Sequence, residues 1–350
     1  MTLSLGGGYD SPGNNGRLLQ GIESQMRDIF RFRSEYVINF DAIKFKEFGP
    51  REDAMDMVAI DGSYTFLLNV SSMWLGIVRA GALRYSFKDK GYQLVDSKSI
   101  DVPITISTWK SIVETQSERH RIIYKTKEGS TNVHKEMMNE FRHCIEGEIA
   151  LSACKKHKDC IIAIDGALVA YNQELDWLRD VVDGCNKNGN ILIGVSKDSH
   201  THAFNNPRRD EEIFKLGDGI AFVRVPEFFE RNHRGTLYGS IYFAKFQKDA
   251  PKWFRVDIGT FKEDPSFALS NVAVYSNSGL CLGYPYPLLE AHRFAVTVRQ
   301  FKDMYEDMMF KIADDCGFHA HDILEGLTHT EGDRKGAYHE YIDKVSRDLR

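Results

Sequence analysis

The chain has 350 residues, of which 42% are hydrophobic and 27% are charged, and its formal net charge is −5 with a pI near 6.2. This composition is that of a folded globular protein, and the length allows one large domain or two ordinary ones. The negative net charge argues against a protein that coats nucleic acid by bulk charge. It does not exclude an enzyme with a local basic groove. The sequence shows no CxxC pair, no leader-like N-terminal segment and no long apolar span, which argues against a zinc site and a membrane anchor and predicts a cytoplasmic protein with reduced thiols.

The N-terminal part of the chain divides into a polar start, a helical stretch and a run of strands. Residues 1–16 are rich in Gly, Ser and Asn and are predicted to be disordered. Apolar residues at helical spacing predict one or two helices over residues 18–48. Residues 57–87 favour an antiparallel meander of about three strands. Residues 88–132 are polar, contain the basic cluster 119–121, and indicate no clear element.

Helices and strands alternate in the rest of the chain. The apolar periods predict, in chain order, a helix over 133–156, a strand over 161–164, a helix over 175–185, a strand over 190–195, strands over 238–246 and 253–258, and a helix over 290–313. The alternation in the first half of this series argues for α/β layering, and the two later strands are expected to pair antiparallel. A stiff loop of prolines and tyrosines precedes the last helix. A charged tail begins at His319.

The tetrapeptide Ala-Ile-Asp-Gly occurs twice and places Asp61 and Asp165 directly after apolar runs. We expect each aspartate at the end of a buried strand, just as the chain turns. A buried carboxylate is costly unless it is paired or binds a metal, and oxygen ligands suit Mg²⁺ or Mn²⁺. Glu146 and Glu148 on the preceding helix are further candidates, of which at most one faces the site because they point to different faces. In the competing structural interpretation, each Asp-Gly pair simply forms a turn and the glutamates are solvated.

Two later segments carry polar side chains that suit phosphate chemistry. Lys197 follows the third apolar strand, where an ammonium group could neutralise a phosphate or hold a carboxylate. A proline-rich loop presents Tyr284 and Tyr286, and His292 follows near a helix start, where it could transfer a proton or bind a metal or phosphate. Taken alone, each of these residues is also compatible with an ordinary packed or solvated side chain.

In their order along the chain, these segments resemble the NurA nuclease family. They are Asp-Gly-Ser-Tyr after a strand, a helix glutamate before a strand that ends in Asp-Gly-Ala-Leu, Gly-Val-Ser-Lys, and Gly-Tyr-Pro-Tyr-Pro-Leu-Leu-Glu-Ala-His-Arg. The resemblance runs from about Ala59 to Val298. It implies an α/β fold with an RNase H-like core, in which a mixed central β-sheet is flanked by helices. We place this nuclease domain at residues 17–318, followed by a charged tail over 319–350 that could form a helix.

The resemblance also implies a function and a set of site residues. The family uses Mn²⁺ or Mg²⁺, acts on single- and double-stranded DNA ends as a 5′–3′ exonuclease and single-strand endonuclease, and works as a homodimer with the HerA hexameric ATPase. The implied process is DNA end resection in double-strand break repair and homologous recombination. By position, the resemblance implies Asp61, Glu148 and Asp165 as metal ligands, His292 and Lys197 as further catalytic residues, and Tyr284, Tyr286 and Arg293 as DNA contacts.

Several alternatives remain open from the sequence. Glu146 competes with Glu148 for the place of the helix glutamate, because Gly147 disturbs the local pattern. An apolar strand followed by Asp-Gly-Ser also resembles the phosphate loop of actin-like ATPases and sugar kinases, but no glycine-rich second loop follows Asp165. A non-catalytic scaffold that grips DNA or the ATPase ring is the third interpretation, and the retained acidic set argues against it. Apolar residues of the 18–48 helices or of the C-terminal tail are candidates for contact with the ATPase.

Overall fold

The computed structural model of the protein describes residues 20–28, 43–70, 73–105, 107–108, 133–170, 177–204, 210, 219–259, 264–300 and 302–317. The chain divides into two units, residues 1–44 and 45–350. In the first unit, residues 20–28 form a helix that exposes Ile22 and Met26. No helix of the described residues is long and apolar enough to cross a membrane.

Some of the expected segments cannot be compared with the structure. The predicted disordered start, the basic cluster 119–121 and the tail from His319 lie outside the described residues. The expected domain limits at 17 and 318 fall there as well, and stay predictions. The expectation of helix up to residue 48 is wrong at its end, because Lys46–Glu47 form the short strand β1, which pairs with a strand from much later in the chain.

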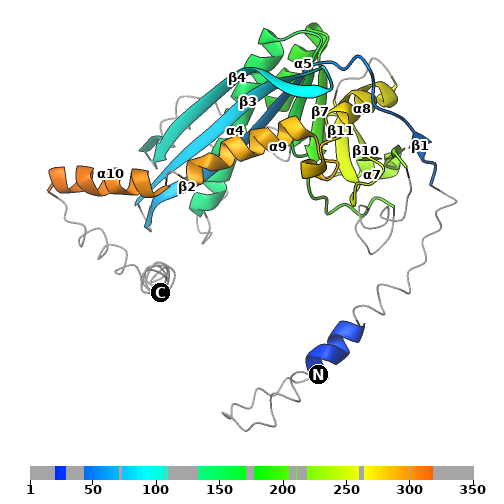
Figure 1. Ribbon diagram of the computed structural model, residues 1–350. Coiled ribbons are helices and arrows are strands. Elements are labelled where there is room, and N and C mark those ends of the chain that lie inside the picture. The colour runs from blue at the N-terminus through cyan, green and yellow to red at the C-terminus, as the bar shows by residue number, and fades with distance from the viewer. Residues whose placement is uncertain are drawn as a thin grey trace. The chain divides into compact units, whose positions relative to one another are not determined.

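A nine-stranded mixed sheet forms the centre of the second unit, with strand order β1-β8-β10-β11-β7-β5-β2-β3-β4 (Figure 1). After β1, its strands are β2 Met57–Val70, β3 Met73–Lys88, β4 Gly91–Thr105, β5 Ile161–Asp165, β7 Ile191–Ser196, β8 Ala221–Arg224, β10 Ser240–Lys245 and β11 Phe254–Ile258. The short strands β6 Val169–Ala170 and β9 Thr236–Leu237 pair separately. The helices whose bounds the structure describes in this unit are α4 Val133–Lys156, α5 Trp177–Lys187, α7 Glu227–Arg231, α8 Pro265–Val274, α9 Tyr286–Val296 and α10 Lys302–Asp315, with 3₁₀ turns η4 Gly279–Cys281 and η5 Thr297–Arg299.

Five neighbouring strands make the RNase H-like core that the sequence predicts. Strands β2, β3 and β4 form an antiparallel meander, and β5 and β7 continue the sheet beside β2 in parallel. The helices α4 and α5 make the crossovers between β4, β5 and β7. On the far side of β7, the antiparallel strands β11, β10, β8 and β1 extend the sheet. The expected antiparallel pairing of the two later strands is confirmed by β10 and β11.

The repeated Ala-Ile-Asp-Gly segments lie side by side in this core. In the parallel ladder of β2 and β5, Ala59 is opposite Ala163 and Ile60 is opposite Ile164. The first two letters of the repeat therefore occupy matching positions on two adjacent strands. Since parallel strands are covered on both faces, each needs a continuous apolar run, which explains why the two segments look alike. The register places Asp61 and Asp165, the next residues along, next to each other.

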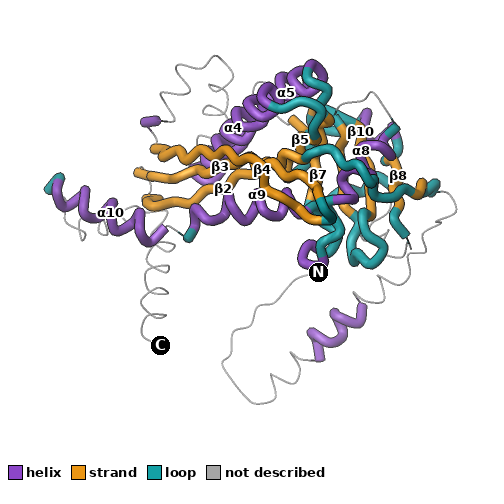
Figure 2. The backbone as a smooth tube through the Cα atoms, turned by 45° about the horizontal axis from the view of Figure 1, so that its top comes forward, coloured by secondary structure: helices purple, strands orange, loops and turns teal. Residues whose placement is uncertain are grey.

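Helices cover both faces of the core, as Figure 2 shows with α4 and α5 on one side and α9 on the other. Successive side chains of a strand point to opposite faces. Met57 and Ala59 accordingly belong to the core cluster that includes residues of α8 and α9, whereas Val58 and Ile60 belong to the cluster that includes residues of α4 and α5. By the same alternation, the Asp61 side chain belongs to the α9 face. The next residue, Gly62, faces α4.

Two expectations about element lengths need correction. The expected three-strand meander over 57–87 is longer, because β2 and β3 alone cover Met57–Val70 and Met73–Lys88. The third strand, β4, lies in the polar segment for which the sequence indicates no clear element. The single helix expected over 290–313 is divided into α9, η5 and α10. At the break, the Thr297 hydroxyl donates to the carbonyl of Phe294 at 2.5 Å and accepts from Arg79. Such side-chain bonds to the backbone compete with regular helix geometry.

Candidate active site

The candidate site is built on Asp61 of β2 and Asp165 of β5. Strand β5 ends at Asp165, whereas β2 continues to Val70. The expectation that Asp61 also ends a strand is therefore wrong: it lies within a long strand, beside the point where its parallel neighbour stops. At this step in the sheet the ladder between β2 and β5 stops at Ile60, and both aspartates follow directly after it. Asp61 is only 6% exposed, and one of its oxygens accepts from the amide of Gly62 at 2.8 Å.

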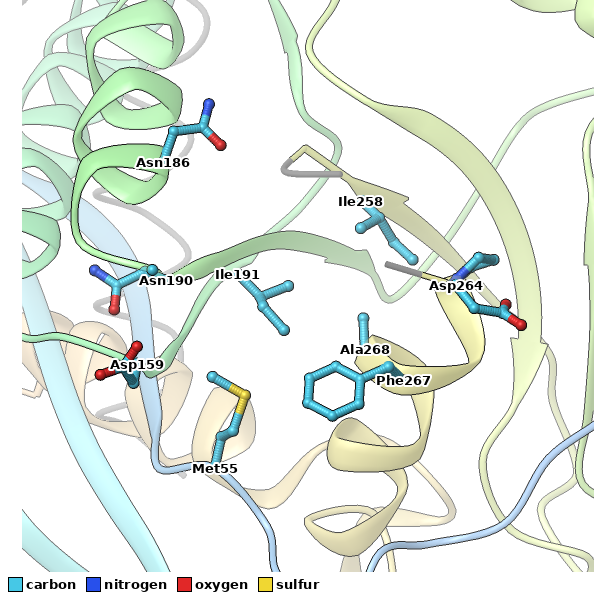
Figure 3. A pocket seen from close by; sticks show the side chains of 11 residues that line it. Met55, Asp159, Asn186, Asn190, Ile191, Ile258, Asp264, Phe267 and Ala268 are labelled. Carbon is cyan, nitrogen blue, oxygen red and sulfur yellow. The ribbon is translucent and has the colours of Figure 1, made fainter. Parts of the chain in front are cut away.

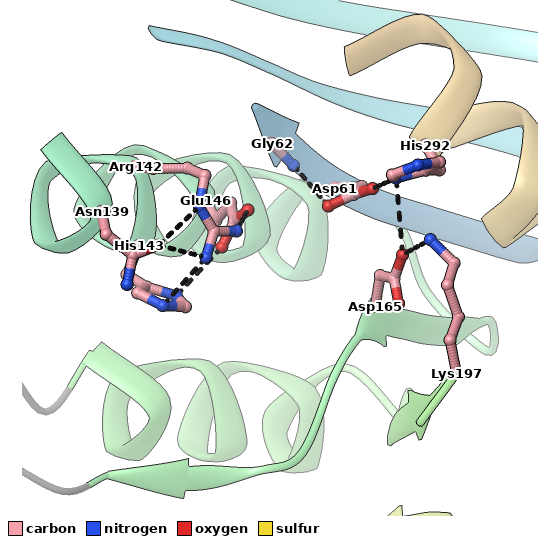
Figure 4. Close-up of polar contacts among 9 residues, drawn as sticks. All are labelled: Asp61, Gly62, Asn139, Arg142, His143, Glu146, Asp165, Lys197 and His292. Atoms are coloured by element: carbon pink, nitrogen blue, oxygen red, sulfur yellow. Dashed lines mark hydrogen bonds and ion pairs between the residues drawn. The ribbon is translucent and has the colours of Figure 1, made fainter. Parts of the chain in front are cut away.

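His292 of α9 completes a compact group with the two aspartates (Figure 4). Its Nδ1 atom lies 2.7 Å from Asp61 Oδ2 and 3.9 Å from Asp165 Oδ2. The three side chains offer ligand atoms that all lie within 4.8 Å of one another. His292 is 43% exposed in its side chain, so the group is open to solvent on the helix side. The structure thus brings together three of the residues that the sequence predicts for one site.

Tyr284 and Lys197 both contact Asp165. The Tyr284 hydroxyl donates to Asp165 Oδ1 at 3.0 Å, and the Lys197 ammonium pairs with Asp165 Oδ2. Burial raises the pKa of Asp165, and the nearby Asp61 carboxylate raises it further, while Lys197 and Tyr284 lower it. Burial and the neighbouring Asp165 hold the pKa of Tyr284 well above its ordinary value, so this phenol remains a hydrogen-bond donor.

The helix glutamate that approaches the sheet is Glu146. Its side chain is buried, and an added Cβ at Gly62 would lie 2.7 Å from its Oε1 atom. The absence of a side chain at Gly62 therefore makes room for this carboxylate on the α4 face. Glu148 is exposed, which corrects the preference for it as the residue facing the site. The reason is helical phase: two residues along a helix turn the side chain by about 200°, so only one of the two glutamates points toward β2.

The sequence matches the NurA domain family over residues 55–297, which is most of the chain. This chain belongs to the NurA family. No curated protein matches it. Among solved structures, the NurA nuclease from Sulfolobus solfataricus is similar with a TM-score of 0.56 at 14% identity, covering 87% of this chain and 98% of that one. Also similar are a second NurA crystal structure (TM-score 0.44, 12% identity, 80% of this chain and 92% of that one) and the catalytic domain of human endonuclease V (TM-score 0.40, 11% identity, 82% and 98%).

Family membership confirms the resemblance drawn from the motifs. The likeness to the Sulfolobus structure shows a shared fold at this low identity, and agrees with the mixed sheet flanked by helices. Membership in the NurA family also supports nuclease activity for this chain. It displaces the actin-like and sugar-kinase interpretation, which rested on one aspartate-glycine loop.

The three residues predicted to contact DNA differ in how far they are exposed in this NurA protein. Tyr284 is 5% exposed and its hydroxyl donates to Asp165, so its ring is buried and not presented as a surface for DNA. Tyr286 stacks on Tyr92 with ring centroids 5.0 Å apart, and packs against the core cluster on the α9 face. The prolines of this segment restrict its backbone, and the side chains of both tyrosines pack against the protein core. Arg293 is exposed and pairs with Glu290 at 2.8 Å.

Arg293 also lines an open hollow beside α9. The hollow has a volume of about 580 Å³ and includes Lys98 of β4 and Gln300 past the end of η5. Its lining mixes apolar side chains such as Leu94 and Phe294 with the charged side chains of Lys98, Glu290 and Arg293. A second cavity, of about 310 Å³, lies elsewhere and is lined by Met55, Ile191 and Phe267 among others (Figure 3). It adjoins the start of β7, whereas Lys197 follows the end of that strand, so this cavity belongs to the opposite end of the sheet.

Sequence reasoning missed two residues that support the loop after Asp165. Asp257 of β11 accepts from the backbone amide of Leu168 at 2.9 Å, and Arg255 holds Asp257 through two bonds of 2.8 Å. Both side chains are almost fully buried. The chain turns at Gly166, whose φ of +131° favours glycine. The period-two spacing of Arg255 and Asp257 in an apolar strand was the available signal, because it puts opposite charges on one buried face.

Proposed function

We propose that this protein is a divalent-metal-dependent DNA nuclease that hydrolyses phosphodiester bonds. The observation that carries the proposal is the group of Asp61, Asp165 and His292, whose ligand atoms converge within 4.8 Å at the step in the sheet. Two carboxylates and one imidazole suit Mn²⁺, and carboxylates also suit Mg²⁺. The donor set therefore fits the metal that the family resemblance implies.

Each residue of the group has a defined task in this proposal. When bound, a divalent cation activates water and stabilises charge on the phosphate. Asp61 and Asp165 provide fixed oxygen ligands, and Tyr284 orients Asp165 from below. His292 is exposed enough to bind the cation or the phosphate. Lys197, whose side chain is 34% exposed, offsets negative charge next to Asp165.

Glu146 takes the role of the helix glutamate in the proposed site. It reaches the sheet at Gly62, one residue beyond Asp61 along β2. In this proposal three elements supply carboxylates near the step in the sheet: β2 with Asp61, β5 with Asp165 and α4 with Glu146. Glu148, on the exposed side of α4, is assigned no role.

The finer function follows from the family resemblance and is part of the proposal. We infer that the enzyme acts on DNA ends in resection and double-strand break repair, as a 5′–3′ exonuclease and single-strand endonuclease. The proposed partners are DNA, a HerA-type hexameric ATPase and a second copy of the chain, in the cytoplasm. The exposed Ile22 and Met26 on the first helix support the N-terminal segment as a contact surface.

A nuclease assay with Mn²⁺ on end-labelled single- and double-stranded DNA tests the proposal. Wild-type protein should cleave, whereas Asp61→Ala and Asp165→Ala should lose most of the activity. Glu148→Gln is a matched control, because it removes a carboxylate from the same helix on its exposed side. Equal cleavage by all variants would show that the site assignment is wrong. No cleavage by wild type, alone or with its ATPase, would favour a non-catalytic scaffold.

A further inference from the structure

Every acidic side chain of the site already has a cationic or donor partner (Figure 4). The pairs are Lys197 with Asp165, Arg142 with Glu146, and His292 with Asp61. Two of these pairs join a permanent cation to a carboxylate that the proposed function assigns to the metal site. The two cations come from different elements, one from α4 and one from the segment after β7.

Arg142 is the partner that the sequence did not single out. It lies one helical turn before Glu146, and its side chain is 19% exposed while that of Glu146 is 5% exposed. The guanidinium also donates to Asn139 Oδ1 at 3.0 Å, and the second oxygen of Glu146 lies 3.2 Å from His143 Nδ1. Arg142 thus has a second acceptor, Asn139, on its own helix.

A paired carboxylate is not free to bind a metal ion. A divalent cation that uses Glu146 or Asp165 must compete with the guanidinium or ammonium group already there. Two like charges a few ångströms apart repel each other, and partial burial weakens the screening by water. Arg142 and Lys197 therefore oppose metal binding as long as they stay on their carboxylates.

We propose that Arg142 and Lys197 are internal counter-ions, which hold Glu146 and Asp165 before the metal binds and bind the DNA backbone after it. The inference rests on the proposed nuclease function and concerns these two side chains. A guanidinium fork and an ammonium group both suit a phosphodiester, whose oxygens accept charge-assisted hydrogen bonds. Metal binding and DNA binding are then coupled, and the coupling must be equal in both directions.

Isothermal titration of the full-length protein with Mn²⁺, without DNA, tests the first half. Arg142→Met should bind Mn²⁺ about tenfold more tightly than wild type, the effect of removing one nearby like charge at an effective dielectric constant between those of protein and water. Arg231→Met is the matched control. It also breaks an i,i+4 pair between an arginine and a glutamate, but this pair lies on α7, and the Arg231 side chain is 79% exposed. This control should leave Mn²⁺ affinity unchanged. Arg142→Gln keeps a hydrogen-bond donor without the charge and serves if the methionine variant folds poorly.

Binding of a phosphorothioate-linked single-stranded DNA, measured by fluorescence anisotropy, tests the second half. For wild type, Mn²⁺ should strengthen binding relative to EDTA. For Arg142→Met, most of this metal-dependent gain should vanish, and the slope of log affinity against log salt should fall by about one unit in Mn²⁺ but not in EDTA.

The outcomes separate this inference from the function on which it rests. Weaker or unchanged Mn²⁺ affinity in both Arg142 variants shows that the arginine only supports Glu146, and overturns the inference while the nuclease proposal stands. An unchanged Mn²⁺-dependent gain in DNA affinity overturns it as well. A wild-type protein that binds no Mn²⁺ overturns both the inference and the proposed function.

Discussion

Gly62 is the position at which a single methyl group should disable the site with little harm to the fold. In Gly62→Ala, the new Cβ would lie 2.7 Å from Glu146 Oε1 and 2.9 Å from its Cγ, closer than unbonded atoms approach. The Glu146 side chain must move, because the backbone of β2 is fixed by its ladder with β3 on one side. Overpacking in a closed core costs about 1–3 kcal/mol. Since Glu146 is a side chain with some freedom, we expect a loss of stability near the lower end, about 1 kcal/mol.

The effect on activity should be much larger. A displacement of about 1 Å of a catalytic group can reduce the rate about 100-fold, so we expect a loss of this order in kcat/KM for Mn²⁺-dependent cleavage of end-labelled DNA. Urea denaturation measures the stability change in the same preparation. Gly76→Ala is the matched control, because its Cβ would meet the flexible end of Met138, far from any acidic residue of the site. This variant should lose some stability and keep its activity.

A double-mutant cycle decides whether Gly62→Ala acts through the glutamate. Glu146→Ala removes both atoms that the new methyl group would contact first. In that background, Gly62→Ala should cause little further loss of activity, because the two changes remove the same function. An equal loss in both backgrounds, or full activity of Gly62→Ala alone, would refute the reasoning and remove Glu146 from the site.

Three further predictions concern the support of the site and its metal. Tyr284→Phe removes the hydrogen bond to Asp165, worth about 1.5–3 kcal/mol for a charged acceptor, and should lower kcat/KM about tenfold or more with the fold intact by circular dichroism; activity equal to wild type would contradict this. Asp257→Ala leaves Arg255 as an unpaired buried charge and should lower the free energy of unfolding by about 3–5 kcal/mol in urea titrations; a loss below 1 kcal/mol would show that the pair is not needed. Mn²⁺ at about 100 times its Kd should stabilise the wild type by about 2.7 kcal/mol, and this gain should disappear with EDTA and in Asp61→Ala; a shift that survives in the variant would place the ion elsewhere.

The two aspartates show what local sequence can predict. An apolar run followed by Asp-Gly indicates a buried strand that delivers a carboxylate, and the structure confirms both strands. The two segments have the same sequence for a physical reason: they are adjacent strands of one parallel ladder, and both are covered on both faces. The sequence did not show that β2 continues past Asp61, because Ser63 and Thr65 suit a strand as well as a turn.

The glutamate and the tyrosines show where local sequence is insufficient. The apolar residues of α4 include Phe141, Ile145 and Ile149, and both glutamates lie between the last two of these. Which one faces the sheet depends on the rotation of α4 against β2, and Gly62 decides it by leaving space for Glu146. The family resemblance implies Tyr284 as a DNA contact, whereas the fold buries its side chain and bonds its hydroxyl to Asp165.

The sequence by itself determined the helix-strand alternation over 133–196, the two apolar strands with their aspartates and the motifs that indicate the NurA family, because these depend on neighbouring residues and on periodicity. Only the tertiary structure decided that Glu146 and not Glu148 packs against β2 at Gly62. It also decided that Tyr284 donates a hydrogen bond to Asp165, and that Arg142 and Lys197 form ion pairs with Glu146 and Asp165. These choices depend on which surfaces of separate elements meet. That packing is a property of the whole folded chain, which no local pattern contains.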